Sequence, residues 1–347
     1  MQAMTNSLKP ILAKLVQRQN LSTDEASFAM QEIMEGRASS SQMAGFLIAL
    51  SMKGEDVGEI VGLAKTMRAQ AVRITSGAED CFDTCGTGGD SSNTFNVSTL
   101  AAVVLAGCGL SVAKHGNRSV SSNCGSADLL EGMGVNVEAD VWIVEECFSQ
   151  LGMAFLYAPI FHPSMRHIGP TRKDLGVRTA FNLLGPLTNP ANAKRQLIGV
   201  PKPELTEFMA HALLELGSES AWVVHGSDGL DEISITGDTK VSSLENGTVS
   251  TFYVHPSDFG LSCAAIESVR VSGLDESLSI AKAVLDDGDG PAKDFVLMNA
   301  AASLLIAGKV TSLEDGVMLA REAVASGKAR NIVSALGVIT RQDDVSA

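Results

Sequence analysis

The chain has 347 residues, which is enough to bury a large core and favours two domains. Apolar residues make up 45% of it and charged residues 19%, an ordinary balance for a globular protein. The formal net charge of -14 argues against a main role in non-specific binding to nucleic acid or anionic membranes. No apolar run approaches the ~20 residues of a membrane span, and the first residues lack an export signal. Because the six cysteines are scattered and form no C-x-x-C pair, the sequence predicts free thiols and a cytoplasmic location.

The first 72 residues are predicted to form a small all-helical domain. Apolar residues recur at helical spacing from Leu8 to Val16, and residues 22–25 have the pattern of a helix cap. Further helices are expected after residue 39 and from residue 56. This bundle has no cluster of catalytic residue types, so we expect it to pack, to make subunit contacts and to close one side of a cleft.

Residues 73–347 have the pattern of a large α/β domain. Short strand-like runs alternate with helical segments, which predicts a mostly parallel central sheet covered on both faces. A polar hairpin is expected after the last of these strands, and the chain is helical again from residue 275. The expected strands are 82–84, 110–113, 154–157, 197–200 and 221–225; the helices 97–107, 125–133, 140–151 and 203–216; the hairpin 233–237 with 241–254; and the C-terminal apolar stripes 278–285, 294–306 and 316–325.

A glycine-rich stretch at residues 83–99 is predicted to be a strand end, a loop and a helix start. Gly86, Gly88 and Gly89 allow the backbone to come close to a ligand, and residues 96–99 include helix-capping types. A helix N-terminus suits a phosphate, but the carboxylate of Asp90 would repel one. We therefore expect Asp90 to face a ribose hydroxyl, an amine or a metal-bound water. The stretch is neither G-x-G-x-x-G nor a Walker loop, and by itself it could be an ordinary turn of an α/β fold.

A second polar loop, at residues 114–128, repeats this design after the next strand. It carries two cations, Lys114 and Arg118, together with the hydroxyls of Ser119, Ser121 and Ser122. Successive strand-to-helix loops of an open parallel sheet emerge at the same edge, so the two loops can hold one ligand from both sides. Lysine supplies a point charge and arginine a fork of donors that matches phosphate oxygens. One such loop could be a solvated cap, whereas two adjacent ones with complementary chemistry indicate a phosphate site.

These motifs, with others farther along the chain, resemble the anthranilate phosphoribosyltransferase family. The matching stretches run in order over most of the sequence: 86–90, 96–99, 114–118, 125–128, 162–165, 172, 175–179, 181–190 and 231–232. The resemblance implies transfer of phosphoribose from 5-phosphoribosyl 1-pyrophosphate to the amine of anthranilate, in tryptophan biosynthesis. It also implies Mg²⁺, a homodimer formed through the helical domain, and a segment near 162–190 that returns to that domain.

The resemblance also implies roles for particular residues, but it assigns no catalytic side chain. The expected phosphoribosyl pyrophosphate contacts are Gly86, Gly89, Asp90, Thr94, Asn96, Val97, Ser98, Thr99, Lys114, His115, Gly116, Asn117, Arg118, Ser119, Val120, Ser121, Ser122 and Ser126. The expected anthranilate contacts are Gly86, Asn117 and Arg172. The expected Mg²⁺ ligands are Ser98, Asp231 and Glu232.

Physical reasons support some of these roles. Diphosphate leaves poorly until its charge is neutralised, and Mg²⁺ prefers carboxylate, water and phosphate oxygens, although Asp231 and Glu232 alone would also suit a solvated loop. Arg172 can bind a carboxylate through two hydrogen bonds, with Arg166 and Arg178 as neighbouring competitors. An aromatic amine is neutral at pH 7 and needs no base before attack, so His115 is expected at most to orient it.

Three other interpretations remain at this point. A pyrimidine nucleoside phosphorylase shares this architecture, although its glycine-loop and lysine motifs differ. A non-catalytic, nucleic-acid-binding member of the same fold is disfavoured by the negative charge and by the acidic pair. A helical scaffold protein would leave both polar loops unexplained. The sequence therefore predicts small-molecule partners, and neither a nucleic acid nor a membrane.

Overall fold

The computed structural model describes residues 7–74, 80–90, 92–119 and 124–342. Three of the predicted ligand contacts, Val120, Ser121 and Ser122, lie outside these residues. Within them, no helix is both long and apolar enough to cross a membrane.

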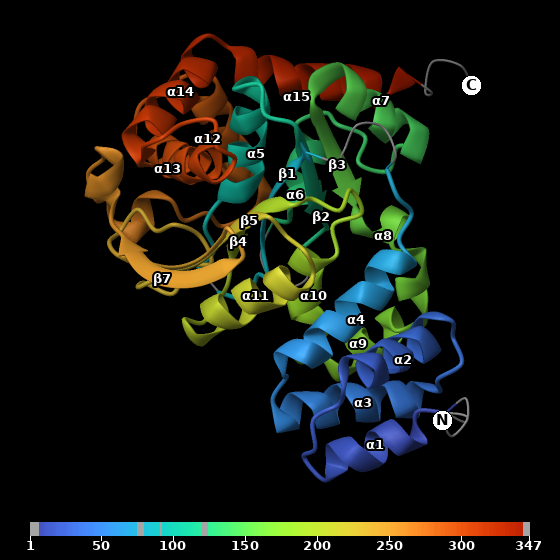
Figure 1. The fold of residues 1–347 in the computed structure, drawn as a ribbon. Helices are drawn as coiled ribbons and strands as arrows, with labels where there is room; N and C mark the ends of the chain where they lie inside the picture. Colours follow the sequence, from blue (N-terminus) through green and yellow to red (C-terminus); the bar gives the residue numbers. More distant parts are fainter. Residues whose placement is uncertain (1–6, 75–79, 91, 120–123, 343–347) are drawn as a thin grey trace.

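The N-terminal part is a bundle of four helices, drawn in blue in Figure 1: α1 Lys9–Val16, α2 Thr23–Met34, α3 Ser40–Lys53 and α4 Val57–Ala69. Three of these helices begin with a capping box, in which the cap side chain and the third helical residue bond to each other's backbone N–H groups. Ser22 pairs in this way with Glu25, and Ser39 with Gln42. The cap predicted at residues 22–25 is therefore present, and the two capping boxes fix where α2 and α3 begin.

The rest of the chain is built on a seven-stranded sheet in the order β3-β2-β1-β4-β5-β6-β7. The five strands β1 to β5 are parallel, and β6 and β7 add an antiparallel hairpin at one edge. This arrangement confirms the predicted mostly parallel sheet. The strands are β1 Phe82–Gly86, β2 Val112–Gly116, β3 Met153–Tyr157, β4 Arg195–Gly199, β5 Ser220–Gly226, β6 Thr239–Glu245 and β7 Thr248–Val254.

Several predicted strand boundaries differ from the structure, and two of these differences are the largest. The second strand does not end at residue 113 but continues to Gly116, so Lys114 and His115 lie in the sheet rather than in a loop. The hairpin begins at residue 239, and residues 233–237 form no strand; Asn246 and Gly247, with φ of 49° and 73°, make its turn. Both errors have the same cause, since the length of a strand depends on pairing with distant neighbours.

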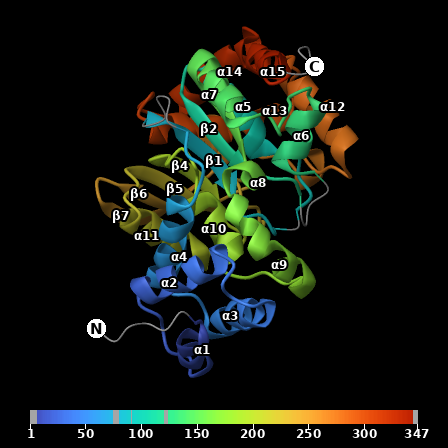
Figure 2. The same cartoon turned by 90° about the vertical axis from the view of Figure 1, so that its right-hand side faces the viewer.

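Helices cover both faces of the sheet, as Figures 1 and 2 show. Residues 158–187, where prolines and glycines recur, form three short α-helices and a 3-10 helix at Pro163–His167. The helix α15 was not predicted separately. The helices are α5 Val97–Gly107, α6 Ser126–Gly132, α7 Val141–Leu151, α8 Ala158–Phe161, α9 Gly169–Leu175, α10 Phe181–Leu187, α11 Glu204–Glu215, α12 Leu274–Leu285, α13 Pro291–Ile306, α14 Leu313–Ala325 and α15 Lys328–Ile339.

Two apolar cores lie on opposite faces of the sheet. The larger surrounds α5 and the C-terminal helices, which lie at the top of Figure 1. The second joins the bundle to α11 and to the other sheet face, where Ile198 and Val223 are buried. Phe181 and Leu184 of α10 belong to this second core together with side chains of the bundle. The bundle is therefore packed on the α/β part close to the carboxyl ends of β1 and β2.

Candidate functional site

Two recesses meet between the bundle and the carboxyl ends of β1 and β2. The first, which we call the polar cleft, has a volume of about 330 Å³ and is lined by the loops after β1 and β2. The second, the apolar cavity, has about 520 Å³ and extends to Met67 of α4 and Arg172 of α9. Gly86, His115 and Asn117 line both recesses. A ligand in one recess therefore lies beside a ligand in the other.

The loop after β1 and the start of α5 form the first wall of the polar cleft. At Gly89 the backbone has φ of +87°, and a Cβ atom there would overlap the guanidinium of Arg178, so only glycine fits. Asn96 does not cap α5 through its side chain, contrary to expectation. Its Nδ2 instead donates to the Cys124 carbonyl at 3.0 Å, which ties the first loop to the second. In the first turn of α5, the Val97 N–H donates to the Phe95 carbonyl at 2.8 Å and the Ser98 N–H donates to Glu232.

The loop after β2 forms the opposite wall and is organised by Asp128. Its carboxylate accepts hydrogen bonds from the backbone N–H groups of Ser119 at 3.1 Å and Gly125 at 2.8 Å. The hydroxyl of Ser126 donates to the Asn117 carbonyl at 3.2 Å. Asn117 is consequently held at the boundary between the polar cleft and the apolar cavity.

Lys114 differs from the solvated loop cation that the sequence suggested. It lies in β2, its residue is 2% exposed, and its Nζ donates to the Thr84 carbonyl at 2.6 Å. Burial lowers its pKa, and the charge of the fully buried Asp83 opposes that change. Asp83 was missed by the sequence analysis because a carboxylate inside a strand is satisfied only across the sheet, here by the His115 backbone N–H at 3.2 Å.

Arg118 is similarly occupied within the protein. Its Nη1 contacts Glu131 at 2.6 Å, its Nη2 contacts Glu138 at 3.2 Å, and its Nε donates to the Tyr157 hydroxyl at 3.2 Å. The hydrogen bond to Glu131 is the first of several that raise the pKa of Arg118. Its guanidinium therefore holds the second loop in place as it lines the cleft.

Three carboxylates, Asp90, Asp231 and Glu232, meet at the polar cleft. Burial, and then the charge of Asp90, raises the pKa of Asp231 to about 7. Burial, and then the charge of Asp231, raises the pKa of Glu232 to about 8. Asp231 accepts from the Gly88 backbone N–H at 2.9 Å, and Glu232 from the Ser98 N–H at the start of α5. Repulsion among these groups makes the cleft a site for a divalent cation.

The donor set fits Mg²⁺ held jointly with a ligand. No group of three or more His, Cys, Asp or Glu side chains in the described parts of the chain is arranged to hold a metal alone. Mg²⁺ usually takes one or two carboxylates and completes its shell with water and substrate phosphates. Asp231, Glu232 and the hydroxyl of Ser98, close to the Nζ of Lys114 at 3.5 Å, supply such oxygens.

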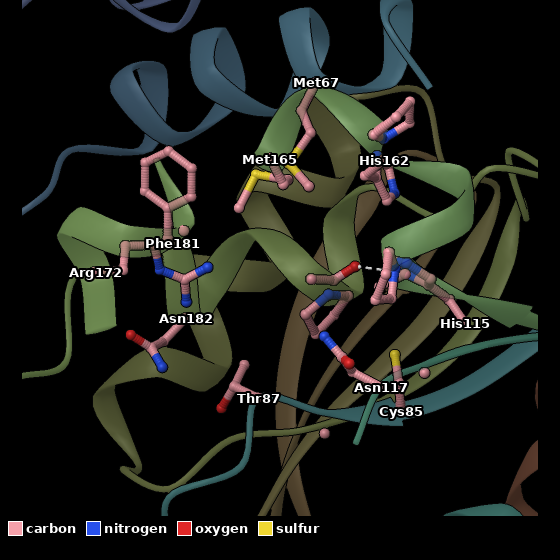
Figure 3. Close-up of a pocket in the computed structure, with 18 of the residues that line it drawn as sticks. Met67, Cys85, Thr87, His115, Asn117, His162, Met165, Arg172, Phe181 and Asn182 are labelled. Carbon is pink, nitrogen blue, oxygen red and sulfur yellow. Dashed lines mark hydrogen bonds between the residues drawn. The ribbon is translucent and has the colours of Figure 1, made fainter. Parts of the chain in front are cut away.

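The apolar cavity has a different character, shown in Figure 3. Met67, Met165 and Phe181 form its walls, and the guanidinium of Arg172 lies 5.3 Å from the centre of the Phe181 ring. Arg172 is half-buried, which lowers its pKa, and it forms no ion pair among the described residues. Such a group stabilises a carboxylate in an otherwise apolar space. Arg166 also lines this cavity, whereas Arg178 lines the polar cleft.

His115 and His162 lie in the wall of the apolar cavity, with their ring centres 5.1 Å apart. The dashed line in Figure 3 joins His115 Nδ1 to the Gly185 carbonyl, at 3.1 Å, so this nitrogen is the protonated donor. Burial, and then the neighbouring His162, lowers the pKa of His115 to about 3. Burial lowers the pKa of His162 to about 4. Both rings are therefore neutral at physiological pH, which leaves Arg172 and Arg166 as the charged groups of the described cavity wall.

The structure brings the predicted site residues together. Every predicted phosphoribosyl pyrophosphate contact in the described residues lines the polar cleft, as do Asp231 and Glu232. Gly86, Asn117 and Arg172 all line the apolar cavity. Sequence reasoning missed Gly199, where a Cβ atom would overlap the Asp231 backbone. The sequence signal that could have identified Gly199 is its place as a glycine near the carboxyl end of a predicted strand, where the backbone of another segment can approach closely.

Comparisons with known proteins agree with this architecture. The helical bundle domain of the glycosyl transferase family matches residues 9–71, and its a/b domain matches residues 78–330. The chain therefore belongs to this glycosyl transferase family, whose two domains correspond to the helical bundle and the α/β part. Within it, the chain is a member of the anthranilate phosphoribosyltransferases: it is 49% identical to that enzyme of Acetivibrio thermocellus, over 93% of both chains, and 50% identical to that of Moorella thermoacetica, over 93% of this chain and 95% of the relative.

Solved structures show the same relationship. The anthranilate phosphoribosyltransferase of Thermus thermophilus superposes with a TM-score of 0.89 at 42% identity, covering 95% of this chain and 99% of that one. The Saccharomyces cerevisiae enzyme in complex with PRPP and Mg has a TM-score of 0.87 at 29% identity, covering 96% and 97%. The same yeast enzyme with 4-fluoroanthranilate has a TM-score of 0.87 at 28% identity, covering 98% and 99%.

Proposed function

We propose that this enzyme transfers the phosphoribosyl group of 5-phosphoribosyl 1-pyrophosphate to the amine of anthranilate. The products are N-(5-phosphoribosyl)anthranilate and diphosphate, in the biosynthesis of tryptophan. The observation that carries the proposal is the half-buried Arg172, which has no ion-pair partner among the described residues and lies in an apolar cavity adjoining a polar cleft with three carboxylates. An aromatic acid fits the first recess and a metal-bound diphosphate fits the second.

The phosphoribosyl donor is proposed to lie in the polar cleft. The partial positive charge at the start of α5 and the backbone and hydroxyls of the loop after β2 face its phosphate oxygens. Lys114 contributes positive charge from within the sheet, because its Nζ lies only 3.5 Å from the hydroxyl of Ser98. Asp90, held by Ser92, suits the ribose hydroxyls. These residues fix the donor with its anomeric carbon toward the shared wall at Gly86 and Asn117.

Mg²⁺ is proposed to be the cofactor, held by Asp231, Glu232 and Ser98. When bound, it neutralises the charge of the diphosphate and so makes it a better leaving group. The related yeast enzyme was solved with PRPP and Mg. The acidic pair of this chain, whose pKa values are raised, is stabilised as carboxylates by a divalent cation.

Anthranilate is proposed to bind in the apolar cavity with its carboxylate on Arg172. Its ring then lies among Met67, Met165 and Phe181, and its amine points toward Gly86 and Asn117. The amine lone pair forms the new bond to the anomeric carbon as the bond to diphosphate breaks, and the amine then loses a proton to solvent. Positioning and exclusion of water supply most of the rate enhancement, since the attacking amine is already neutral.

The fluorescence of anthranilate provides the test. It should fall when the enzyme, phosphoribosyl pyrophosphate and Mg²⁺ are all present, and stay constant when any one is omitted or EDTA is added. A nucleoside with inorganic phosphate should give no free base. Phosphate-dependent release of a base from a nucleoside, with no loss of anthranilate, would assign the chain to the phosphorylases instead. The comparisons favour the transferase over that alternative and over a nucleic-acid-binding role.

We further propose that the enzyme is a cytoplasmic homodimer formed through its helical bundle. Val16 of α1 and Met52 of α3 are 77% and 70% exposed, which is costly for apolar side chains on an isolated bundle. Cys81, Cys85 and Cys147 are unpaired thiols, as expected in a reducing compartment. Light scattering after gel filtration should give twice the chain mass, and V16E/M52E should give the monomer. If the unmutated protein is a monomer, the proposed homodimer is wrong.

A further inference from the structure

A third recess lies at the amino ends of the parallel strands, opposite the polar cleft at their carboxyl ends. It has a volume of about 780 Å³ and is bordered by the residues that precede β1, β4 and β5 and by the last turns of α4. We call it the basal recess and define it by its charged residues, Lys65, Arg68, Arg73, Asp80, Lys194 and Glu219. None of its lining residues belongs to the polar cleft or to the apolar cavity. It is therefore a separate site on the molecule.

The charges of the basal recess do not balance. Its two acids are both held by Arg195, which contacts Glu219 at 3.0 Å and Asp80 at 3.7 Å. The four cations of the recess form no ion pair with any carboxylate in the described ranges of the chain. A group of cations without a carboxylate partner among the described residues is notable on a protein with a net charge of -14.

Arg68 is the central cation of this group. Its Nε donates to the Leu187 carbonyl at 2.6 Å, and its Nη1 donates to Asn192 Oδ1 at 3.1 Å and to the Leu216 carbonyl at 3.4 Å. All of these acceptors are neutral, so they hold the guanidinium in place without cancelling its charge. Burial lowers the pKa of Arg68 to about 10, which still leaves it charged at neutral pH. A fixed, half-buried cation without a counter-ion favours an anion in the adjoining space.

The remaining walls indicate what kind of anion fits. Ile74, Ala191 and Leu216 supply apolar surface between the cations. A recess of this size holds a whole small molecule, whereas the net charge of the protein repels an extended polyanion. We propose that the basal recess binds a small organic anion with an apolar body and two or more carboxylate, phosphate or sulfonate groups.

A fluorescent hydroxypyrene trisulfonate has this chemistry and serves as the probe. Its anisotropy is measured on titration with the full-length protein in EDTA, where the acidic polar cleft repels anions. We expect saturable binding that Arg73→Gln/Lys194→Gln weakens at least about tenfold, since two charge-assisted contacts are lost. The matched control, Lys202→Gln/Lys309→Gln, removes two cations that lie outside every recess described here and should change the affinity less than about twofold.

Three results would overturn the proposal: no binding, equal weakening in both double variants, or displacement of the dye by diphosphate with Mg²⁺, which would place it in the polar cleft. If the recess variant fails to show a thermal transition, Lys65→Gln replaces it. This exposed residue of α4 can change without unfolding the chain, and its loss should weaken binding about threefold. The test does not depend on the transferase reaction, so the two proposals can fail separately.

Discussion

The apolar cavity and the polar cleft share a wall but are prepared for their ligands in opposite ways. In the described wall of the cavity the histidines are neutral and the charged groups are two cations, Arg172 and Arg166. The cleft has an excess of acid, because Asp90, Asp231 and Glu232 meet there while Arg118 is engaged by Glu131 and its neighbours. An aromatic acid can therefore enter the cavity alone, whereas a diphosphate needs a divalent cation with it.

This difference assigns two tasks of the proposed reaction to different recesses, acceptor recognition to the cavity and donor activation to the cleft. In the proposed function, recognition of the acceptor depends on Arg172 and a shaped apolar wall. Activation of the donor depends on oxygens that repel one another until a cation binds. Changes in the cleft should accordingly reduce the rate, and changes in the cavity should reduce the affinity for the acceptor.

The largest effect is expected in the polar cleft. Glu232→Gln removes a carboxylate that receives the Ser98 N–H and lies beside Asp231. We expect kcat to fall about a hundredfold and the Mg²⁺ concentration for half activity to rise, since charge stabilisation of the leaving group is lost. Steady-state rates across a Mg²⁺ titration give both values. Asp238→Asn, an exposed acid outside the cleft, serves as the control; an equal loss in both variants would contradict the assignment.

A smaller effect is expected in the apolar cavity. Arg172→Ala should raise the KM for anthranilate about thirtyfold and leave the KM for the donor within about twofold, because a charged hydrogen bond to the acceptor is lost. Arg166→Ala is the matched comparison, since Arg166 lines the same cavity without facing the Phe181 ring. If Arg166→Ala has the larger effect, the carboxylate lies at Arg166. Loss of activity with both KM values unchanged would exclude either assignment.

The neutral histidines of the cavity predict acid lability. The pKa values of His115 and His162, about 3 and about 4, lie below the ~6.5 of an unfolded histidine. Between those values the unfolded chain binds protons that the folded chain does not, so the free energy of unfolding falls as the pH falls below ~6.5. Each histidine should cost about 2 kcal/mol at pH 5.

Urea unfolding at pH 7 and pH 5 measures this loss. His162→Gln should reduce the pH-dependent difference by about 2 kcal/mol, whatever it does to stability at pH 7. The exposed His211→Gln should leave the difference unchanged. If the free energy of unfolding of His162→Gln differs between pH 7 and pH 5 as much as that of the unmutated protein, the His162 ring is charged in the folded protein at pH 5.

The sequence predicted the two loops well because strand, loop and helix signals are local. It also placed Asp231 and Glu232 correctly beside them, through the family resemblance. It could not distinguish Arg172 from Arg166, since that choice depends on how α9 packs against Phe181. Nor could it show that Lys114 is buried: the length of β2 is set by pairing with β3, and the partner Asp83 lies on another strand. Contacts between distant segments decide these points, and no local pattern encodes them.

The smallest effect concerns Arg118, which lies in the loop after β2 and lines the cleft. Glu131→Gln removes its strongest partner, a contact of 2.6 Å on the protein surface. If Arg118 turns toward the diphosphate when the donor binds, it must first break its ion pair with Glu131. The variant has no such ion pair to break, so the KM for the donor should fall about twofold. If Arg118 instead holds the loop after β2, the same KM should rise. Glu145→Gln, a carboxylate on α7, is the control, and donor KM measured at fixed Mg²⁺ distinguishes the two directions. A fall in the KM for the donor would mean that Arg118 leaves Glu131 only when the donor binds. The cleft would then differ from the apolar cavity in its cation as well as in its carboxylates.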